Sequence, residues 1–399
     1  MKKVAKEAEE SILERLPPEL WGEIGKRLKT RLDLVRFRST CNSWRSNLPP
    51  ASDLFPLRIP SPPGNPIDDR RYHFVITERT GYLHLPGKNP VRIVVFESIG
   101  SSLYSLIPFY ENAPYGTFQK VMAFLDMQQC SVNSLFTGHF ISIVSSNKRR
   151  NLVVGPWAGP NILVDKILLI SYDNIAKIPL RVNPNYTGKK DEIDLIVVAL
   201  MSSGEVNFLS TQLMEWKSIT SSKFDDIINY EANLWVVDKY GSAYVMDFKS
   251  VTMRQVVRPP KGFNFVGGRM RLVEASGELY MLAPNLVLDH HKSSNEIKIF
   301  QLKGSRWVQV KGIGKHVFYV MSSFSFSIIV DRKGRGNCIL LDRMSFCRFI
   351  SSRGFIYRDH PLFPQMCDHD TGFGVYDIEN EIEDKFKILD YEDLPHIFC

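Results

Sequence analysis

Few side chains in this chain have the type and spacing that catalysis or metal binding requires. Asp370-Thr371-Gly372 matches the tripeptide of an acid protease, but that chemistry needs two facing carboxylates and no second copy is present. Gly188-Lys189-Lys190 lacks the upstream glycine and the Ser or Thr of a phosphate-binding loop. His290-His291 would point to opposite faces of a strand. The Cys, His and Asp side chains within residues 367–370 fit no familiar metal site. We therefore expect a binding protein with no catalytic residue, no metal and no cofactor.

Length and composition predict a globular protein with a sizeable core. The chain has 399 residues, of which 44% are hydrophobic and 23% charged. No stretch approaches the ~18–20 consecutive apolar residues that span a bilayer, so no membrane partner is expected. The six cysteines are scattered and contain no Cys-x-x-Cys pair, which indicates reduced thiols. These features predict a location in the nucleus, the cytoplasm or both.

The net charge of +7 is unevenly distributed. Residues 368–399 contain ten acidic side chains and two lysines, so the rest of the chain carries about +15. The basic residues are dispersed, however, and the densest run, Lys148-Arg149-Arg150, is short. A solvated surface explains this pattern better than a nucleic-acid interface, so nucleic acid is not the expected partner.

Residues 11–50, which follow a flexible N-terminus at 1–10, have the pattern of short amphipathic helices. Pro17 and Pro18 suit the first turn of a helix, where their missing N–H groups would have no partner inside the helix. Apolar residues then recur at helical spacing, first at Leu20, Ile24 and Leu28 and then from Leu34 to Trp44. Because so small a module cannot bury a core of its own, it needs either a partner or the larger domain that follows.

The same residues resemble an F-box, the segment by which F-box proteins dock onto the adaptor subunit of SCF ubiquitin ligases. The resemblance lies in Leu16-Pro17, in the apolar spacing of the first helix, and in Cys41-Asn42-Ser43-Trp44-Arg45 at the end of the second. It implies that the chain binds the SCF adaptor and, through it, the cullin and RING subunits. The implied adaptor-binding and supporting surface comprises Leu16, Pro17, Leu20, Ile24, Leu28, Leu34, Phe37, Cys41 and Trp44.

Residues 51–70 are predicted to be a linker, since four prolines within Ile59–Pro66 describe a semi-rigid spacer. From residue 71 to 399 the chain consists of short β-branched and aromatic runs separated by turn signals. The turn signals include Arg79-Thr80-Gly81, Lys239-Tyr240-Gly241 and Ala275-Ser276-Gly277. A mainly antiparallel β-domain is expected.

Weak internal repetition favours a β-propeller over the alternative, a β-sandwich. Leu234–Phe248 and Met270–Leu282 share a frame of strand, glycine-containing turn and Tyr-bearing strand, and Thr77–Leu85 is a third copy. Trp216 and Trp307 each open a short strand, so we expect both to be structural anchors of blades. Such units run about 40 to 50 residues, which predicts about six or seven blades.

The later strands, from Arg271 to Asp342 and again at Asp370–Asp377, support a second resemblance. They are similar to the kelch-like domain that follows the F-box in a large plant family, catalogued as domain of unknown function 295. This resemblance implies a kelch-like β-propeller over residues 71–399, with an acidic segment from 368, and a role as a substrate receptor.

These observations predict the substrate-recognition subunit of an SCF-type cullin-RING E3 ubiquitin ligase, with an unknown protein substrate bound by the propeller. The alternative is a propeller scaffold or nucleic-acid-associated regulator that works without a cullin. Recognition is expected on the longest connections between strands. Their aromatic residues, which could instead cap blade edges, are Tyr110, Tyr115, Trp157, Tyr186, Phe263 and Phe265.

Overall fold

The chain folds into a series of antiparallel β-units. The computed structural model describes residues 20, 57–64, 72–84, 92–98, 104–107, 130–145, 153–154, 164–171, 195–210, 214–220, 222–247, 252–261, 268–289, 292–321, 323–330, 336–342, 372–378 and 386–390. Within these residues, no helix is long and apolar enough to cross a membrane.

The described strands form five units in chain order. The first contains β1 (Leu57–Ile59), β2 (Tyr72–His84), β3 (Arg92–Ser98), β4 (Tyr104–Ile107), β5 (Cys130–Ser145) and β6 (Val153–Val154). The second contains β7 (Val164–Ser171), β8 (Leu195–Met201), β9 (Val206–Ser210) and β10 (Glu215–Thr220). The third contains β11 (Phe224–Tyr230), β12 (Asn233–Asp238), β13 (Ala243–Asp247) and β14 (Thr252–Val257). The fourth contains β15 (Arg271–Ala275), β16 (Glu278–Asp289), β17 (Lys292–Lys303) and β18 (Arg306–Val310). The fifth contains β19 (His316–Val320), β20 (Ser325–Ile329), β21 (Cys338–Asp342), β22 (Gly372–Asp377) and β23 (Phe386–Asp390).

The second, third and fourth units are simple meanders in which each strand pairs with the next along the chain. The two outer units are more complex. The first has the order β5-β2-β3-β4, with β1 on β2 and β6 on β5, and the fifth has the order β20-β19-β21-β22-β23, with β19 parallel to β21. A single residue pair, His139 with Ile167, joins β5 to β7 and so connects the first two units into one sheet.

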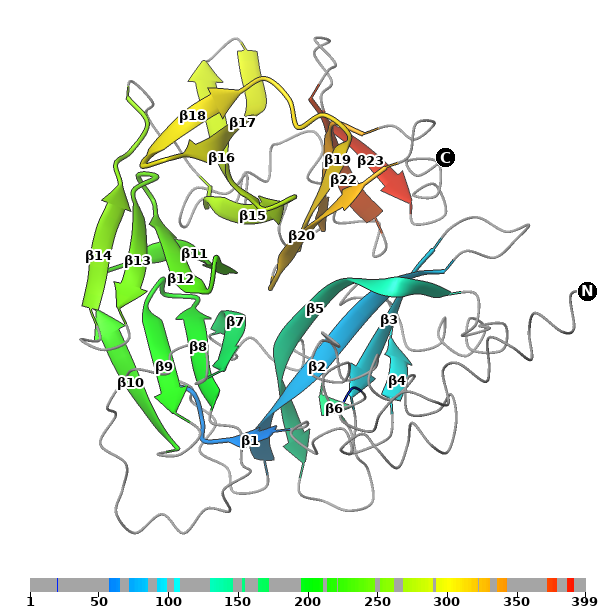
Figure 1. The fold of residues 1–399 in the computed structure, drawn as a ribbon, viewed down its shortest axis with the longest axis vertical. Coiled ribbons are helices and arrows are strands. Elements are labelled where there is room, and N and C mark those ends of the chain that lie inside the picture. Colours follow the sequence, from blue (N-terminus) through cyan, green and yellow to red (C-terminus); the bar gives the residue numbers. More distant parts are fainter. Residues whose placement is uncertain are drawn as a thin grey trace, which may run out of the picture.

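The five units surround a common centre, and one strand of each lies on the inside (Figure 1). β11 packs against β7 and β15, β20 packs against β15 and β5, and β5 pairs with β7, so the inner strands form a closed ring. This radial arrangement of small sheets is that of a β-propeller.

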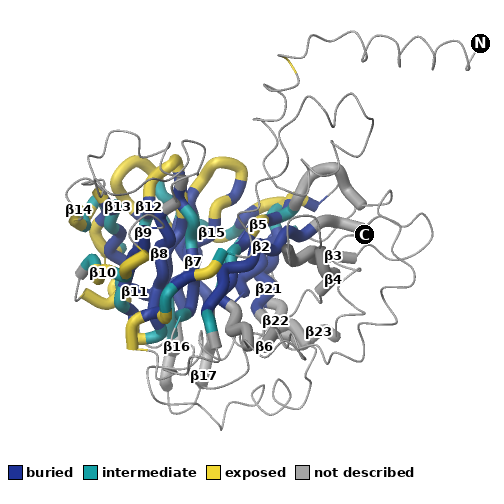
Figure 2. The backbone as a smooth tube through the Cα atoms, turned by 90° about the horizontal axis from the view of Figure 1, so that it is seen from below, coloured by how far each residue is buried: buried dark blue, intermediate teal, exposed yellow. Residues whose placement is uncertain are grey.

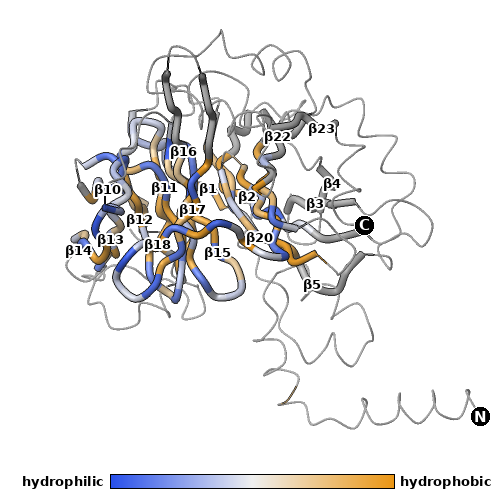
Figure 3. Tube along the Cα trace, turned by 90° about the horizontal axis from the view of Figure 1, so that it is seen from above, coloured by the Kyte–Doolittle hydropathy of each residue, from blue (hydrophilic) through white to orange (hydrophobic). Residues whose placement is uncertain are grey.

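In the third and fourth units the innermost strands are more buried than the outermost ones. In β11 and β15 all described side chains but one are buried, whereas β14 has one buried residue and β18 has one. Figure 2 shows the buried residues along the strands and the exposed ones at the turns, and Figure 3 shows the same separation of hydrophobic and hydrophilic residues.

The described residues form five units, the first two of them joined into one sheet, and the six or seven blades expected for the whole chain stay a prediction. The predicted repeat aligns the wrong strands. Leu234–Phe248 covers β12 and β13, the second and third strands of their unit, whereas Met270–Leu282 covers β15 and β16, the first and second. The error arises because every hairpin in an antiparallel meander has the same local pattern of strand, polar turn and strand.

The turn predicted at Arg79-Thr80-Gly81 is wrong, because β2 runs without interruption from Tyr72 to His84. Gly81 serves close packing instead. A Cβ atom at this position would lie 2.1 Å from Cε1 of Phe136, a residue of the adjacent strand β5. A glycine inside a strand often marks such a close approach, and here that role explains the residue.

Residues 57–64, predicted as part of the linker, pack onto the first two units. β1 pairs with β2, and Ile59 is buried in a cluster with Phe74 and Ile141. Pro62 is also buried. The four prolines within Ile59–Pro66 begin directly after β1, so they end this short strand and do not interrupt its pairing with β2.

Candidate functional site

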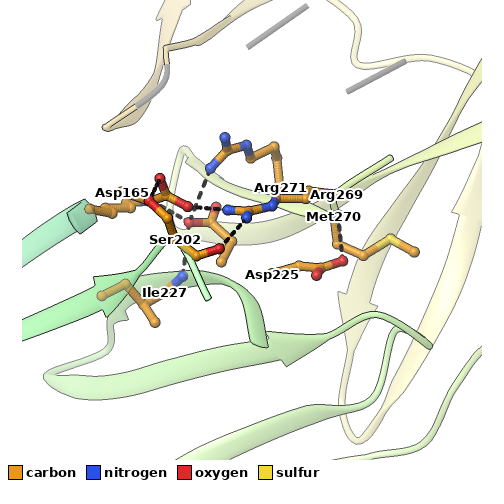
Figure 4. A network of polar contacts seen from close by, with 9 residues as sticks. Asp165, Ser202, Asp225, Ile227, Arg269, Met270 and Arg271 are labelled. Atoms are coloured by element: carbon orange, nitrogen blue, oxygen red, sulfur yellow. Dashed lines mark hydrogen bonds and ion pairs between the residues drawn. The ribbon is translucent and has the colours of Figure 1, made fainter. Parts of the chain in front are cut away.

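A network of charged side chains lies where β7, β11 and β15 begin. Asp165 and Lys166 stand at the start of β7, Asp225 and Asp226 at the start of β11, and Arg269 to Arg271 lead into β15. Because these three inner strands pack side by side, their first residues meet (Figure 4). We call this group the polar seam.

Asp226 is the centre of the polar seam and is completely buried. Its Oδ1 accepts hydrogen bonds from Lys166 Nζ at 2.9 Å and from the Ile227 amide at 2.8 Å. Its Oδ2 accepts the Leu272 amide at 2.8 Å, and Arg271 Nη1 lies 3.8 Å from Oδ1. One carboxylate thus connects the inner strands of the second, third and fourth units.

Asp165 and Asp225 complete the polar seam on either side. Asp225 Oδ2 accepts the Met270 amide at 3.1 Å. Asp165 accepts the Ser202 hydroxyl at 2.7 Å and forms an ion pair with Arg269, whose other Nη donates to the Ser202 carbonyl at 2.7 Å. The segment 269–272 is therefore held by three aspartates from two earlier units.

The electrostatics of the polar seam are those of a closed structural network. Burial lowers the pKa of Lys166, and Arg271 lowers it further, while Asp226 opposes the shift. Three acidic and three basic side chains balance in charge, and buried charges persist only when paired in this way. Most of the network is inaccessible to a substrate, and among the described residues no group of His, Cys, Asp and Glu could hold a metal ion. The arrangement suits positioning of strands.

A second contact region closes the ring between the first and fifth units. Phe136 of β5 stacks on Phe324 at 4.5 Å between ring centroids and lies 4.7 Å from Phe326 of β20. Phe140 meets Phe324 edge to face at 5.5 Å, and Tyr319 stacks on Phe326 at 4.7 Å. We call these five rings the aromatic seam.

The two tryptophans singled out from the sequence occupy equivalent places in the second and fourth units. Each is the second residue of an outermost strand, β10 or β18. Trp307 is 7% exposed and donates its indole N–H to the Gly241 carbonyl of the preceding unit at 2.8 Å. Trp216 is half-buried and donates to the Pro60 carbonyl of the first unit at 3.1 Å. The predicted structural role is confirmed for Trp307, and Trp216 makes the corresponding contact with less burial.

Most of the predicted binding residues lie outside the described residues. Of the F-box set, Leu20 alone is described, with a helical backbone and a side chain that is 44% exposed. The other eight, Leu16, Pro17, Ile24, Leu28, Leu34, Phe37, Cys41 and Trp44, are not described, nor are the six proposed aromatic anchors Tyr110, Tyr115, Trp157, Tyr186, Phe263 and Phe265. The structure therefore does not bring these sets together or separate them.

The polar seam was missed by the sequence analysis, although a signal was present. Val164-Asp165-Lys166-Ile167 and Phe224-Asp225-Asp226-Ile227 share the order apolar, Asp, charged, Ile at the start of successive units. Charged residues entering strongly apolar strands would be buried, and buried charges need partners. This repeat could have aligned the blades correctly.

Comparison with protein families identifies the domain. The sequence profile of the KIB1-4 beta-propeller matches residues 95–377, which is most of the chain and spans strands of all five units. The chain belongs to the KIB1-4 beta-propeller family. Membership agrees with the radial packing of the described units around their inner strands.

Three proteins similar to this chain come from Arabidopsis thaliana. F-box protein SKIP23 is 22% identical over 69% of this chain and 64% of its own length. F-box protein At2g17036 is 21% identical over 78% of both chains. Putative F-box protein At1g65770 is 21% identical over 79% of this chain and 84% of its own. The chain thus spans less than two thirds of SKIP23.

Likeness to solved structures is weak. A yeast Dbp5–Nup159–Gle1 complex aligns with 30% of this chain and 35% of its own at 13% identity, with a TM-score of 0.23. A Bombyx mori β-fructofuranosidase aligns with 60% of each chain at 9% identity, with a TM-score of 0.18. With TM-scores this low, neither alignment shows a shared fold.

Proposed function

We propose that this chain is the substrate-recognition subunit of an SCF-type cullin-RING E3 ubiquitin ligase. In this proposal residues 11–50 form the F-box that binds the SCF adaptor, and the β-propeller binds a target protein. The observation that carries it is the combination of an F-box-like pattern in residues 16–45 with a KIB1-4 beta-propeller behind it. Three similar proteins with F-box in their names support the same reading.

The proposed role requires no catalytic group from this chain. Holding a target next to the ubiquitin-conjugating enzyme raises the effective concentration of target lysines, and proximity alone accelerates transfer. A rigid ring of small sheets suits this task because its turns and connections can vary while the inner strands keep their packing. The polar seam and the aromatic seam would supply that rigidity.

The proposal is tested by replacing Leu16 and Pro17 together with Ala in the full chain. Recovery of the SCF adaptor with the purified protein should be lost, because both residues belong to the expected adaptor surface. A matched control replaces Glu23 and Lys26 with Ala, since these residues lie off the apolar face of the same predicted helix. Adaptor recovery should be unchanged in the control.

Two measurements make the outcome decisive. Thermal unfolding of the propeller should be the same in both variants, because the changes lie in a separate module. Equal adaptor recovery from the Leu16/Pro17 variant and the parent would refute the F-box assignment. If the parent protein recovered no adaptor and instead bound nucleic acid in a salt-dependent way, the alternative of a regulator that works without a cullin would be supported.

A further inference from the structure

Five exposed side chains gather on the outer rim between the third and fourth units. Tyr240 is 57% exposed and lies beside Lys239, whose Nζ is 4.7 Å from the ring centroid. Arg258, Lys303 and Arg306 are exposed as well. We call these five residues the rim patch.

Three backbone contacts bring the rim patch together from separate elements. Ala243 pairs with Val257, which places Arg258 beside the turn between β12 and β13. Arg258 and Arg306 form a parallel β-bridge, and Lys303 pairs with Arg306 across the turn between β17 and β18. The Trp307 indole donates to the Gly241 carbonyl, which fixes that turn against β18. Figure 1 shows the end of β14, the β12–β13 turn and the start of β18 at one point of the rim.

The positive charge of the rim patch is not neutralised within the described part of the molecule. No ion pair joins Arg258, Lys303 or Arg306 to another described residue. The carboxylate of Asp238, next to Lys239 in the sequence, accepts hydrogen bonds within its own turn and strand. It accepts the Tyr240 amide at 2.8 Å, the Ser242 amide at 2.9 Å and the Tyr244 hydroxyl at 3.2 Å.

Like charges held on adjacent backbones repel one another in the free protein, and a bound anion would remove that repulsion. Arginine pairs well with carboxylates because its planar guanidinium donates two parallel hydrogen bonds. An exposed tyrosine beside the cations adds apolar contact area, and Tyr and Arg tend to dominate the energy of protein interfaces. The patch therefore combines charge and aromatic contacts that suit a peptide.

The surroundings of the rim patch favour a short occupant. Asp247 is exposed at the far end of β13, and Glu215 is exposed on β10, which packs against β14. Arg254 within β14 and Lys261 just beyond it are exposed as well, so the basic surface follows β14 and the two acids lie at its border. A nucleic-acid strand is held by a basic groove that follows its backbone over many nucleotides, whereas the exposed basic residues here lie along one six-residue strand and at its end.

We propose that the rim patch binds an acidic peptide segment, rich in Asp and Glu and containing an apolar side chain, of the protein that is ubiquitinated. This inference rests on the proposed substrate-receptor function and names the class of segment recognised. Lys239, Arg258, Lys303 and Arg306 pair with its carboxylates, and Tyr240 contacts its apolar residue.

The test uses the full chain and a fluorescein-labelled ten-residue peptide of Asp and Glu with one central Leu, followed by fluorescence anisotropy at 0.1 M salt. Arg258→Gln combined with Arg306→Gln should weaken binding roughly tenfold or more, since close charge pairs at interfaces carry such effects. The matched control is Lys217→Gln with Lys223→Gln, two exposed lysines of the second and third units outside the patch. The control should bind within about twofold of the parent, as expected of charges outside the interface.

Additional measurements distinguish a role of Arg258 and Arg306 in peptide recognition from a role in stability. The melting temperature of the Arg258/Arg306 variant should equal or exceed that of the parent, because like-charge repulsion is removed; a fall would overturn the proposal. A Gln/Asn version of the peptide should not bind. No binding of the acidic peptide, an equal loss in the control variant, or tighter binding of a single-stranded oligonucleotide of equal charge would each overturn it.

Adaptor recovery is measured in the same variants to separate the two proposals. It should be normal throughout, because the rim patch lies outside residues 11–50. Normal adaptor recovery without peptide binding would remove this inference and leave the proposed function intact. Peptide binding without adaptor recovery would remove the proposed function and, with it, the assignment of the peptide to a ubiquitinated protein, and would leave only a surface that binds acidic peptides.

Discussion

The polar seam and the aromatic seam perform the same task by opposite physical means. In the polar seam, each hydrogen bond from Asp226 has a defined donor and direction, so the start of β15 can occupy one position relative to β11. In the aromatic seam, the rings make broad contacts that tolerate small shifts. The second, third and fourth units are thus joined by directional bonds, while the first and fifth units meet through adaptable packing. The contact between the first and fifth units closes the propeller, so it must accommodate the small displacements of all the other units. Stacked aromatic side chains accommodate such displacements better than ion pairs and hydrogen bonds of fixed direction.

The largest expected effect comes from removing the centre of the polar seam. Asp226→Ala should lower the free energy of unfolding by about 3–5 kcal/mol, because it leaves Lys166 and Arg271 buried without their carboxylate. Urea denaturation measures the change. Lys166→Met combined with Asp226→Asn should be less destabilising than Asp226→Ala, since no unpaired lysine remains. If the double variant were the less stable of the two, the ion pair would not be the reason for the loss.

The aromatic seam should respond to added volume. Gly81→Ala places a methyl group 2.1 Å from Cε1 of Phe136, and we expect a loss of about 1–3 kcal/mol from overpacking. Adding Phe136→Leu should recover part of the loss because the smaller side chain makes room. The coupling is measured by a double-mutant cycle. Additive effects would show that Phe136 is not what restricts position 81.

A contact between the fourth and fifth units offers a test by pH. His316 Nε2 lies 3.4 Å from the Ser276 hydroxyl, and burial lowers the pKa of His316 below 6.5. The unfolded chain therefore binds a proton more readily, so stability is fully present above pH 6.5 and is lost as the pH falls through the lowered pKa. His316→Gln should make thermal unfolding less dependent on pH between about 4 and 7. An unchanged pH profile would contradict this assignment.

A substitution in a surface turn, outside both seams, should have the smallest effect on the free energy of unfolding. The turn between β11 and β12 holds Glu231 and Ala232 at φ values of 50° and 57°, a conformation that favours glycine. Ala232→Gly should raise the free energy of unfolding by about 0.5–1 kcal/mol, because the left-handed backbone is strained for alanine. Thermal denaturation checks this. The corresponding turn at Ser276 and Gly277 already contains glycine and serves as the comparison.

Local patterns predicted several strands and the structural role of Trp307 correctly. Alternating apolar residues and turn signals are read over a few positions, so β12, β13, β16 and the role of Trp307 were accessible from sequence. The repeat of charged residues at the starts of β7 and β11 was a signal for the polar seam, but the pairing of Lys166 with Asp226 was not accessible, because the two residues are 60 positions apart and meet only when the units stack. Gly81 was mistaken for a turn residue because sequence alone does not show that Phe136 will cover it. The rim patch likewise assembles from three separate segments.

The aromatic seam also affects synthesis of the chain on the ribosome. Phe136 and Phe140 emerge early, but their partners Phe324 and Phe326 lie near the end of the sequence. At about 5–20 residues per second, roughly 10–40 s pass before the ring can close. During that interval the nascent first unit exposes two phenylalanines that the fifth unit contacts in the folded protein, a surface that invites aggregation or chaperone binding. Slowing translation between residues 145 and 324 should therefore reduce the soluble yield more than slowing it after residue 330.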